Sequence, residues 1–361
     1  MHSTDEKKEK VILAGVNTTK KDYNMNELAE LAKTAGLEII GELVQNLDAP
    51  HRATYFGKGK IEELKNLIEE LQADAIITDD ELTSSQLSNL SSNLDAKVID
   101  RTMLILDIFA KNAKSSEALA QVEIAQLRYN LSHLSGLGVS LSRIGGGSSG
   151  GGAYTRGAGE KKIELDRRKI RAKIDKLNED LQSIKSHRDT TRKQRERTGQ
   201  KTVALIGYTN AGKSTLMNAL TDAGVLAQNK LFATLDTTTR KLHIKGKNIL
   251  ISDTVGFIEK LPHAIVKAFR STLEELIYAD CLLHVVDSSN EAHYEQMKVV
   301  YETLEALEAT RIPVITVFNK IDLVKDVILK DDKAEHTVKL SAKKGTNIEE
   351  LTNKITHILN L

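Results

Sequence analysis

Cysteine is almost absent from this chain of 361 residues, which excludes an internal disulfide and suits a reducing compartment. The single Cys281 lies in an apolar run, so a core position is favoured over a nucleophilic one. No apolar run reaches the ~18 residues of a membrane span, and the first residues show no signal segment. The formal net charge of +1 gives no bulk indication of a nucleic-acid partner. These absences predict a cytoplasmic protein without membrane attachment.

The chain is predicted to contain three regions, and the first, residues 1–113, is expected to be an N-terminal α/β domain. It alternates strands with helices, which favours a small parallel sheet. The expected strands are Val11–Val16, Leu37–Val44, Ala75–Thr78 and Lys97–Ile99, and the expected helices are Asn26–Ala35, Lys60–Gln72 and Ser84–Leu94. The turn Gly57–Lys60 could attract phosphate at a helix start, although an ordinary turn is the simpler interpretation.

The second region, residues 114–200, predicts an antiparallel helical hairpin with the glycine-rich loop Gly145–Gly152 at its tip. The first helix, Ser115–Leu134, carries an apolar stripe made of Leu119, Val122, Leu127, Leu131 and Leu134. The second helix starts near Glu160, and its apolar residues are spaced as in a coiled-coil seam. These seam residues are Ile163, Ile170, Ile174, Leu177, Leu181 and Ile184.

The second helix is also a local basic patch. Between Glu160 and Gln200 there are fourteen Lys/Arg against eight Asp/Glu, and Arg143 and Arg156 flank the loop. Helix surfaces often carry such charges merely as a solvated face. Next to a glycine-rich tip, however, they also suit the phosphates of RNA, so both interpretations stay open.

The third region, residues 201–361, is predicted to form a doubly wound, mostly parallel sheet that binds its ligand at the carboxyl ends of the strands. The expected strands are Thr202–Gly207, Ile249–Asp253, Cys281–Asp287, Val314–Asn319 and Thr337–Leu340. Four loops that follow these strands carry the chemistry.

The first loop fits the phosphate-binding pattern G-x-x-x-x-G-K-[ST], between an apolar strand and a helical run over Thr215–Leu220. Its glycines let backbone N–H groups face phosphates. Lys213 would place a charge at the β- and γ-phosphates, and the Ser214 hydroxyl would take one magnesium position. The residues expected to contact nucleotide are Gly207, Tyr208, Thr209, Asn210, Ala211, Gly212, Lys213, Ser214 and Thr215.

The second loop, Asp253-Thr254-Val255-Gly256, ends an apolar strand about forty residues further on. A carboxylate at a strand end can hold magnesium through water, and Gly256 can offer a backbone N–H to the γ-phosphate. The pattern D-x-x-G is weak alone, but its position after the first loop makes it persuasive.

The third and fourth loops predict the base. Asp322 can accept hydrogen bonds from the N1–H and the exocyclic amine of guanine, and adenine does not offer this pair of donors. Asn319 would brace the loop, the Lys320 stem would cover the base, and the Ala342 N–H would be available to the guanine carbonyl oxygen. The residues of these loops are Asn319, Lys320, Ile321, Asp322, Ser341, Ala342 and Lys343.

A switch segment is expected between the first two loops. Its nucleotide-binding candidates are Phe232, Ala233, Thr234, Leu235 and Asp236. A threonine here should complete the magnesium shell when GTP is bound. The spacing does not choose among Thr234, Thr237, Thr238 and Thr239.

These motifs resemble the HflX family of translational GTPases, from about Tyr55 to Leu361. Beyond the general GTPase loops, the matching stretches are Leu231–Asp236, Asp253–Ile258, Leu261–His263, Ala268–Glu275, Thr155–Glu160 and Glu164–Arg168. The resemblance implies that Thr234 is the magnesium ligand beside Ser214 and Asp253, and that Lys213, Thr234 and Gly256 act in catalysis. It also implies binding to the large ribosomal subunit and its RNA, and dissociation of stalled or stress-damaged ribosomes.

Phe257 stands where Ras-like enzymes carry a glutamine that orients water, so slow intrinsic hydrolysis is expected until a partner completes the site. Two alternatives remain. One is a GTP-gated binding module for another RNA or protein partner, with hydrolysis as the reset. The other is an ATPase working through the N-terminal domain, which the family suggests, although residues 1–113 contain no Walker motif.

Overall fold

The computed structural model describes residues 8–18, 23–144, 153–221, 231–232, 238–260, 265, 276–324 and 329–361. Only the backbone is described for residues 135–144, 153–162, 187–189 and 191–196. The chain divides into two compact units, residues 1–111 with 120–180 and residues 112–119 with 181–361. The three-region division proposed from the sequence remains a prediction.

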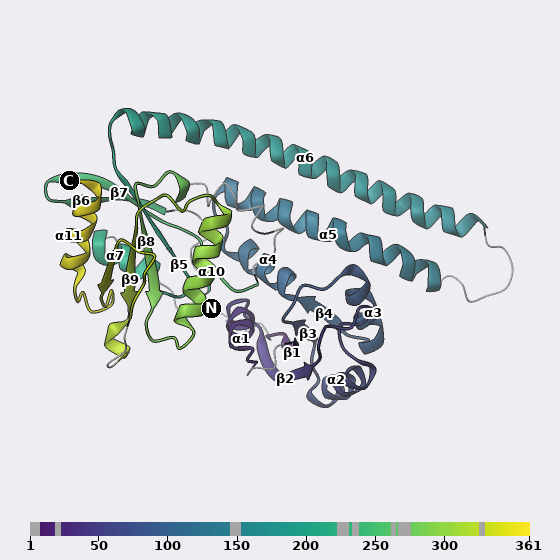
Figure 1. The fold of residues 1–361 in the computed structure, drawn as a ribbon. Helices are drawn as coiled ribbons and strands as arrows, with labels where there is room; N and C mark the ends of the chain where they lie inside the picture. Colours follow the sequence, from purple (N-terminus) through teal and green to yellow (C-terminus); the bar gives the residue numbers. More distant parts are fainter. Residues whose placement is uncertain are drawn as a thin grey trace, which may run out of the picture. The chain divides into compact units, whose positions relative to one another are not determined.

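The first unit contains the expected parallel sheet, in the order β2-β1-β3-β4 (Figure 1). Its strands are β1 (Lys10–Asn17), β2 (Glu38–Asn46), β3 (Ala75–Thr78) and β4 (Lys97–Asp100), and its first helices are α1 (Asn26–Thr34), α2 (Lys58–Leu71) and α3 (Ser84–Leu94). A capping box between Thr83 and Gln86 starts α3. Strand-helix alternation therefore predicted these elements correctly.

One helix of this unit, α4 (Arg101–Asn112), was missed. Seven of its residues are buried, around most of its circumference. Of the remaining residues, Met103, Asp107, Ala110 and Lys111 lie on one more open face, so the helix is amphipathic. It follows β4 directly, with no turn signal between the two elements to mark its start.

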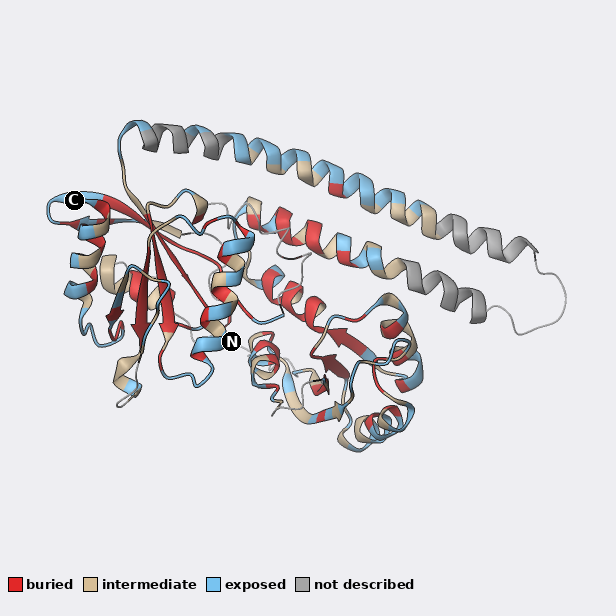
Figure 2. Ribbon diagram, in the orientation of Figure 1, coloured by how far each residue is buried: buried red, intermediate tan, exposed pale blue. Residues whose placement is uncertain are grey.

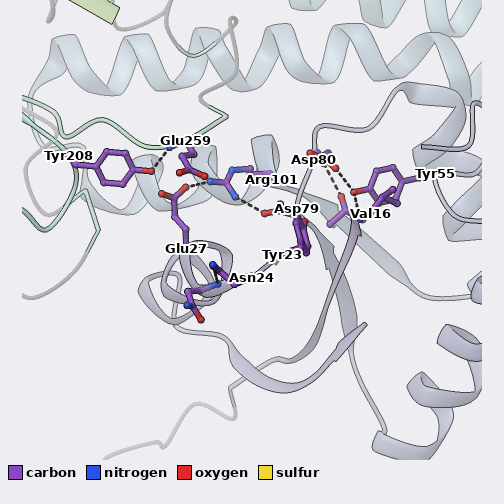
Figure 3. A network of polar contacts seen from close by, with 12 residues as sticks. Val16, Tyr23, Asn24, Glu27, Tyr55, Asp79, Asp80, Arg101, Tyr208 and Glu259 are labelled. Atoms are coloured by element: carbon purple, nitrogen blue, oxygen red, sulfur yellow. Dashed lines mark hydrogen bonds and ion pairs between the residues drawn. The ribbon is translucent and has the colours of Figure 1, made fainter. Parts of the chain in front are cut away.

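Side chains at the carboxyl end of this sheet form a polar network (Figure 3). The Arg101 guanidinium contacts both Asp79, at 2.7 Å, and Glu27, while the Tyr23 hydroxyl donates to Asp79 at 2.5 Å. The Tyr55 hydroxyl donates to Asp80, also at 2.5 Å. Carboxylates therefore occupy the edge of the sheet where a parallel α/β domain usually holds its ligand.

Two long helices follow, α5 (Ser116–Ile144) and α6 (Ala153–Arg197). Lys173 of α6 lies 2.5 Å from Glu123 of α5, and Figure 1 shows the two helices side by side at this point. The glycine-rich loop 145–152 and the side chains of Arg143 and Arg156 lie outside the described residues.

The apolar stripe predicted on α5 is partly wrong, because Leu119 is 48% exposed. Val122 of the predicted stripe is buried, and Ile124, Ala125 and Tyr129, which were not predicted, are buried as well. Of the six predicted seam residues on α6, Ile174 is buried and the other five are partly exposed. Most of the described part of α6 is open to solvent (Figure 2).

The second unit contains a sheet in the order β10-β9-β8-β5-β7-β6. Its strands are β5 (Thr202–Gly207), β6 (Thr238–Ile244), β7 (Lys247–Asp253), β8 (Cys281–Asp287), β9 (Val314–Asn319) and β10 (His336–Lys339). All neighbours are parallel except β6, which pairs antiparallel with β7. Strand β6 was not predicted from the sequence.

Helices α7 (Lys213–Thr221) and α11 (Ile348–Leu359) pack on one face of this sheet, and α10 (His293–Ala306) packs on the other. Burial raises the pKa of Cys281 in β8 to about 12, so its thiol is a core group, as expected. Within the described ranges, none of the helices combines the length and apolar character that a membrane crossing requires. The four predicted loops follow β5, β7, β9 and β10 along one edge of the sheet.

Candidate nucleotide-binding site

The loop after β5 has a backbone that only glycine can supply at two positions. Gly207 has φ +147°, and a Cβ there would lie 2.2 Å from the Val285 carbonyl oxygen. Gly212 has φ +96°, and its Cβ would lie 2.3 Å from Asn319 Nδ2. Both positions combine a left-handed backbone with a close approach, so the two glycines of the sequence pattern are required by the geometry.

Lys213 begins α7 directly after this loop and is buried. Its Nζ donates to the carbonyl oxygens of Gly207, at 3.0 Å, and Tyr208, at 2.8 Å. Burial lowers the pKa of Lys213 to about 8, and the nearby Asp253 carboxylate opposes that shift. The loop thus encloses the Lys213 ammonium, where it can contact a phosphate that binds to the backbone N–H groups of the loop.

Oxygen atoms of the first two loops meet beside Lys213. The Ser214 hydroxyl donates to Asp253 Oδ2 at 2.7 Å, and Asp253 is buried at the end of β7. A hydroxyl and a carboxylate are oxygen ligands of the kind that magnesium prefers, with substrate phosphates and waters completing the shell. The described residues contain no cluster of three or more His, Cys, Asp or Glu that could hold a metal alone. This pair therefore fits magnesium bound together with a phosphate substrate.

The segment after Asp253 lies against the phosphate-binding loop. Phe257 forms a parallel bridge with Tyr208, through Thr209 N to Phe257 O at 2.8 Å and Phe257 N to Gly207 O at 3.1 Å. The Tyr208 hydroxyl accepts from Glu259 N at 2.6 Å (Figure 3). Phe257 is 2% exposed, so its side chain is a packing group.

Asn319, at the end of β9, joins three loops. Its Nδ2 donates to Ala211 O at 2.9 Å, and its Oδ1 accepts from Ala342 N at 3.0 Å. In this structure Asn319 takes the Ala342 N–H, and the use of that donor by a base stays a prediction. A guanine carbonyl would have to replace this bond or use another group.

Lys320 has a left-handed backbone, with φ +62°. Its Nζ donates to Asn210 O at 2.9 Å and lies 2.6 Å from Asp287 Oδ2. Sequence analysis missed Asp287, which ends β8 directly opposite Asn319 in the register. The signal was present, because Asp287 is a carboxylate at the end of an apolar strand, as Asp253 is.

Asp322 follows Lys320 in the turn Ile321–Leu323. A hydrogen bond from the Ser341 hydroxyl, and secondarily Lys344 at 3.7 Å, lower the pKa of the Asp322 carboxyl. Asp322 is therefore an ionised acceptor near neutral pH, as recognition of two N–H donors requires. The structure thus brings the third and fourth loops together at this carboxylate.

The switch segment is described at its start, and at its end, where the candidates Thr238 and Thr239 lie in β6. Phe232 is buried with φ +55°, and its carbonyl oxygen accepts from Asn112 Nδ2 at 2.9 Å. The other candidates, Ala233, Thr234, Leu235 and Asp236, lie outside the described residues, as does Thr237.

Comparison with known families covers most of the chain. Residues 22–110 match the model described as GTP-binding GTPase N-terminal, residues 112–195 the GTP-binding GTPase middle region, and residues 202–320 the 50S ribosome-binding GTPase. The protein named GTPase HflX from Lacrimispora saccharolytica is 52% identical over 356 residues, covering 97% of this chain and 83% of that protein. The GTPase HflX of Escherichia coli is 38% identical, covering 98% and 83% of the two chains.

A solved structure agrees with this fold. The crystal structure of a GTP-binding protein from Sulfolobus solfataricus in complex with GDP has 25% identity and a TM-score of 0.50, covering 98% of this chain and 99% of that one. The fold and the loops at the edge of the second sheet define a P-loop GTPase, an enzyme that converts GTP to GDP and phosphate. Because the relative from Lacrimispora saccharolytica is 52% identical over 97% of this chain, the chain belongs to the HflX family of GTPases.

Proposed function

We propose that this GTPase associates with the large ribosomal subunit in the cytoplasm and dissociates stalled ribosomes under stress. The observation that carries the proposal is the match of residues 202–320 to the 50S ribosome-binding GTPase model. The basic residues of α6 support it, since Arg168 and Arg171 are largely open to solvent, although both lie within 4.0 Å of Glu164. Exposed arginines suit RNA phosphates, whose binding rests mainly on electrostatic contacts.

In this proposal the loop from Gly207 to Thr215 holds the phosphates of GTP. Lys213 stabilises the charge that develops on the β- and γ-phosphates, and Gly256 offers its N–H to the γ-phosphate. Ser214 and Asp253, the latter through water, hold magnesium, together with Thr234 as the family resemblance implies. Magnesium, when bound, neutralises charge on the same phosphates.

The base is assigned to the loops after β9 and β10. Asp322 accepts from the two guanine donors, and its ionised state, which Ser341 supports, suits this role. Asn319 and Lys320 position the loop, because they tie it to Ala211 and Asn210 of the phosphate-binding loop. Base and phosphate recognition are thereby coupled through two side chains.

Hydrolysis by the free protein should be slow. The buried Phe257 cannot orient water by hydrogen bonding, so positioning of the nucleophile has to come from a partner. We expect an intrinsic rate on the order of 10⁻⁴–10⁻² per second, which rises several-fold or more when purified large subunits are added. Multiple-turnover assays with and without large subunits measure this directly.

Co-sedimentation with ribosomes in the presence of a non-hydrolysable GTP analogue is the control for that assay, because it measures ribosome binding without hydrolysis. Equal rates in the two conditions, together with no co-sedimentation, would remove the ribosome from the proposal. The result would then favour a GTP-gated module for another RNA or protein partner.

The tip of the predicted hairpin gives a separate prediction. Replacing Arg143 and Arg156 by alanine should weaken ribosome binding and reduce the slope of log affinity against log salt by about 2, one unit for each lost phosphate contact. Affinity of the free protein for GTP should stay unchanged. A matched control replaces Lys298 and Lys330, which are exposed in the second unit. If the tip variant and this control behave alike, the loop is only a linker.

ATP binding by the N-terminal domain remains a prediction, and the charges at the carboxyl end of its sheet oppose it. Asp79, Asp80 and Glu27 place carboxylates at the carboxyl end of that sheet. Like charges at this edge oppose a polyphosphate. In addition, Lys60 at the start of α2 pairs with Glu63 at 2.7 Å.

A further inference from the structure

The Tyr208 side chain of the phosphate-binding loop makes a hydrogen bond to the segment that follows Asp253. The ring is buried, and the hydroxyl accepts the backbone N–H of Glu259 at 2.6 Å (Figure 3). The two backbone hydrogen bonds between Phe257 and the residues on either side of Tyr208 hold the same segment. The Tyr208 hydroxyl and the two backbone hydrogen bonds of Phe257 thus hold residues 257–259 against the phosphate-binding loop.

In this arrangement Gly256 lies against Lys213 and Thr209, two residues of the loop that would bind the terminal phosphate. A Cβ on Gly256 would lie 2.9 Å from Lys213 Nζ, 2.9 Å from Thr209 Cα and 2.8 Å from Thr209 Cγ2. Lys213 meanwhile donates to two carbonyl oxygens of its own loop. The backbone at Gly256 therefore packs closely against the ammonium, beside which a γ-phosphate has to fit.

We propose that Tyr208 latches the segment 257–259 against the phosphate-binding loop, and that this closed arrangement discriminates against the γ-phosphate of GTP. The inference rests on the assignment of the loop from Gly207 to Thr215 as the phosphate site. A ligand shifts an equilibrium only by its differential affinity for the two states. GDP lacks the γ-phosphate, so it is compatible with the closed arrangement, whereas GTP has to displace Gly256 and release Glu259. Tyr208 is thus a positioning residue that sets the preference between the two nucleotides.

Tyr208→Phe tests the latch because it keeps the ring and every backbone group and removes only the hydroxyl. The ratio of affinities for a non-hydrolysable GTP analogue and for GDP should rise by about 3- to 10-fold, the effect of losing one ordinary hydrogen bond from the closed state. Fluorescent analogues of both nucleotides measure it, with magnesium present. Tyr294→Phe, on the exposed surface of α10, is the matched control and should leave the ratio unchanged.

Hydrogen exchange of the Glu259 amide supplies a second readout. In the unmodified protein with GDP this amide should be protected, and protection should fall with the GTP analogue and in Tyr208→Phe with GDP. An affinity ratio that stays constant or falls in Tyr208→Phe would overturn the latch. If the unmodified protein binds neither nucleotide, the phosphate-site assignment fails, and the latch fails with it.

Discussion

Lys213→Ala should abolish GTP hydrolysis and weaken GTP binding by about 100-fold or more, the loss of charge-assisted hydrogen bonds to two phosphates. The Lys213 ammonium is already enclosed by the loop, 3.0 and 2.8 Å from two carbonyl oxygens, so it needs little reorganisation to meet a phosphate. Equilibrium binding and single-turnover hydrolysis both measure the effect.

Circular dichroism should show that this variant remains folded, because alanine suits the first turn of α7. Lys298→Ala is the control, since its ammonium is exposed on α10 and pairs with Glu302 at 3.8 Å. It should bind and hydrolyse GTP as the unmodified protein does. Nucleotide binding of normal strength by Lys213→Ala would contradict the assignment of the phosphate site.

Asp322→Asn should change which base the enzyme accepts. The amide presents an N–H where guanine also donates, so GTP binding should weaken by roughly 10- to 100-fold, at about 1–3 kcal/mol for each donor left unpaired. Xanthine has a carbonyl where guanine has its amine, so xanthosine triphosphate should bind more tightly to the variant than GTP does. Competition of the two nucleotides against a fluorescent analogue gives both affinities.

The exposed Asp332 offers a matched control, because Asp332→Asn makes the same chemical change outside the loop that holds Asp322. This control should keep its preference for GTP. If Asp322→Asn also keeps it, Asp322 does not read the base, and the roles of Asn319 and Lys320 as braces of that loop would need revision as well.

The strands of both sheets other than β6 were predictable because each is a short apolar run. Strand β6 was missed because it lies at the edge of its sheet, and only Leu242 and Ile244 of its residues are buried. Helix α4 was missed although it has an open face with Asp107 and Lys111, because it follows β4 directly and no turn residue separates the two elements.

The four loops of the site were recognised because each is a local pattern after a strand. Contacts between the loops could not be predicted from the sequence, since they depend on the register of strands that are far apart in sequence. Asp287 reaches Lys320 because β8 and β9 pair with Asp287 opposite Asn319. The Ala342 N–H is taken by Asn319 for a similar reason, as the two residues are 23 positions apart. Tertiary structure, and not composition, decides these partners.

The path of the chain limits how this enzyme can be dissected. Residues 112–119 belong to the same unit as the GTPase loops, although more than sixty residues of the other unit follow them before the chain returns at 181. A fragment cut at residue 201 would therefore lack Asn112, and with it the hydrogen bond to the Phe232 carbonyl at the start of the switch segment. Rates measured on such a fragment would describe a switch missing one of its anchors. Joining residues 112–119 to the fragment through a short linker would restore that anchor in a smaller enzyme.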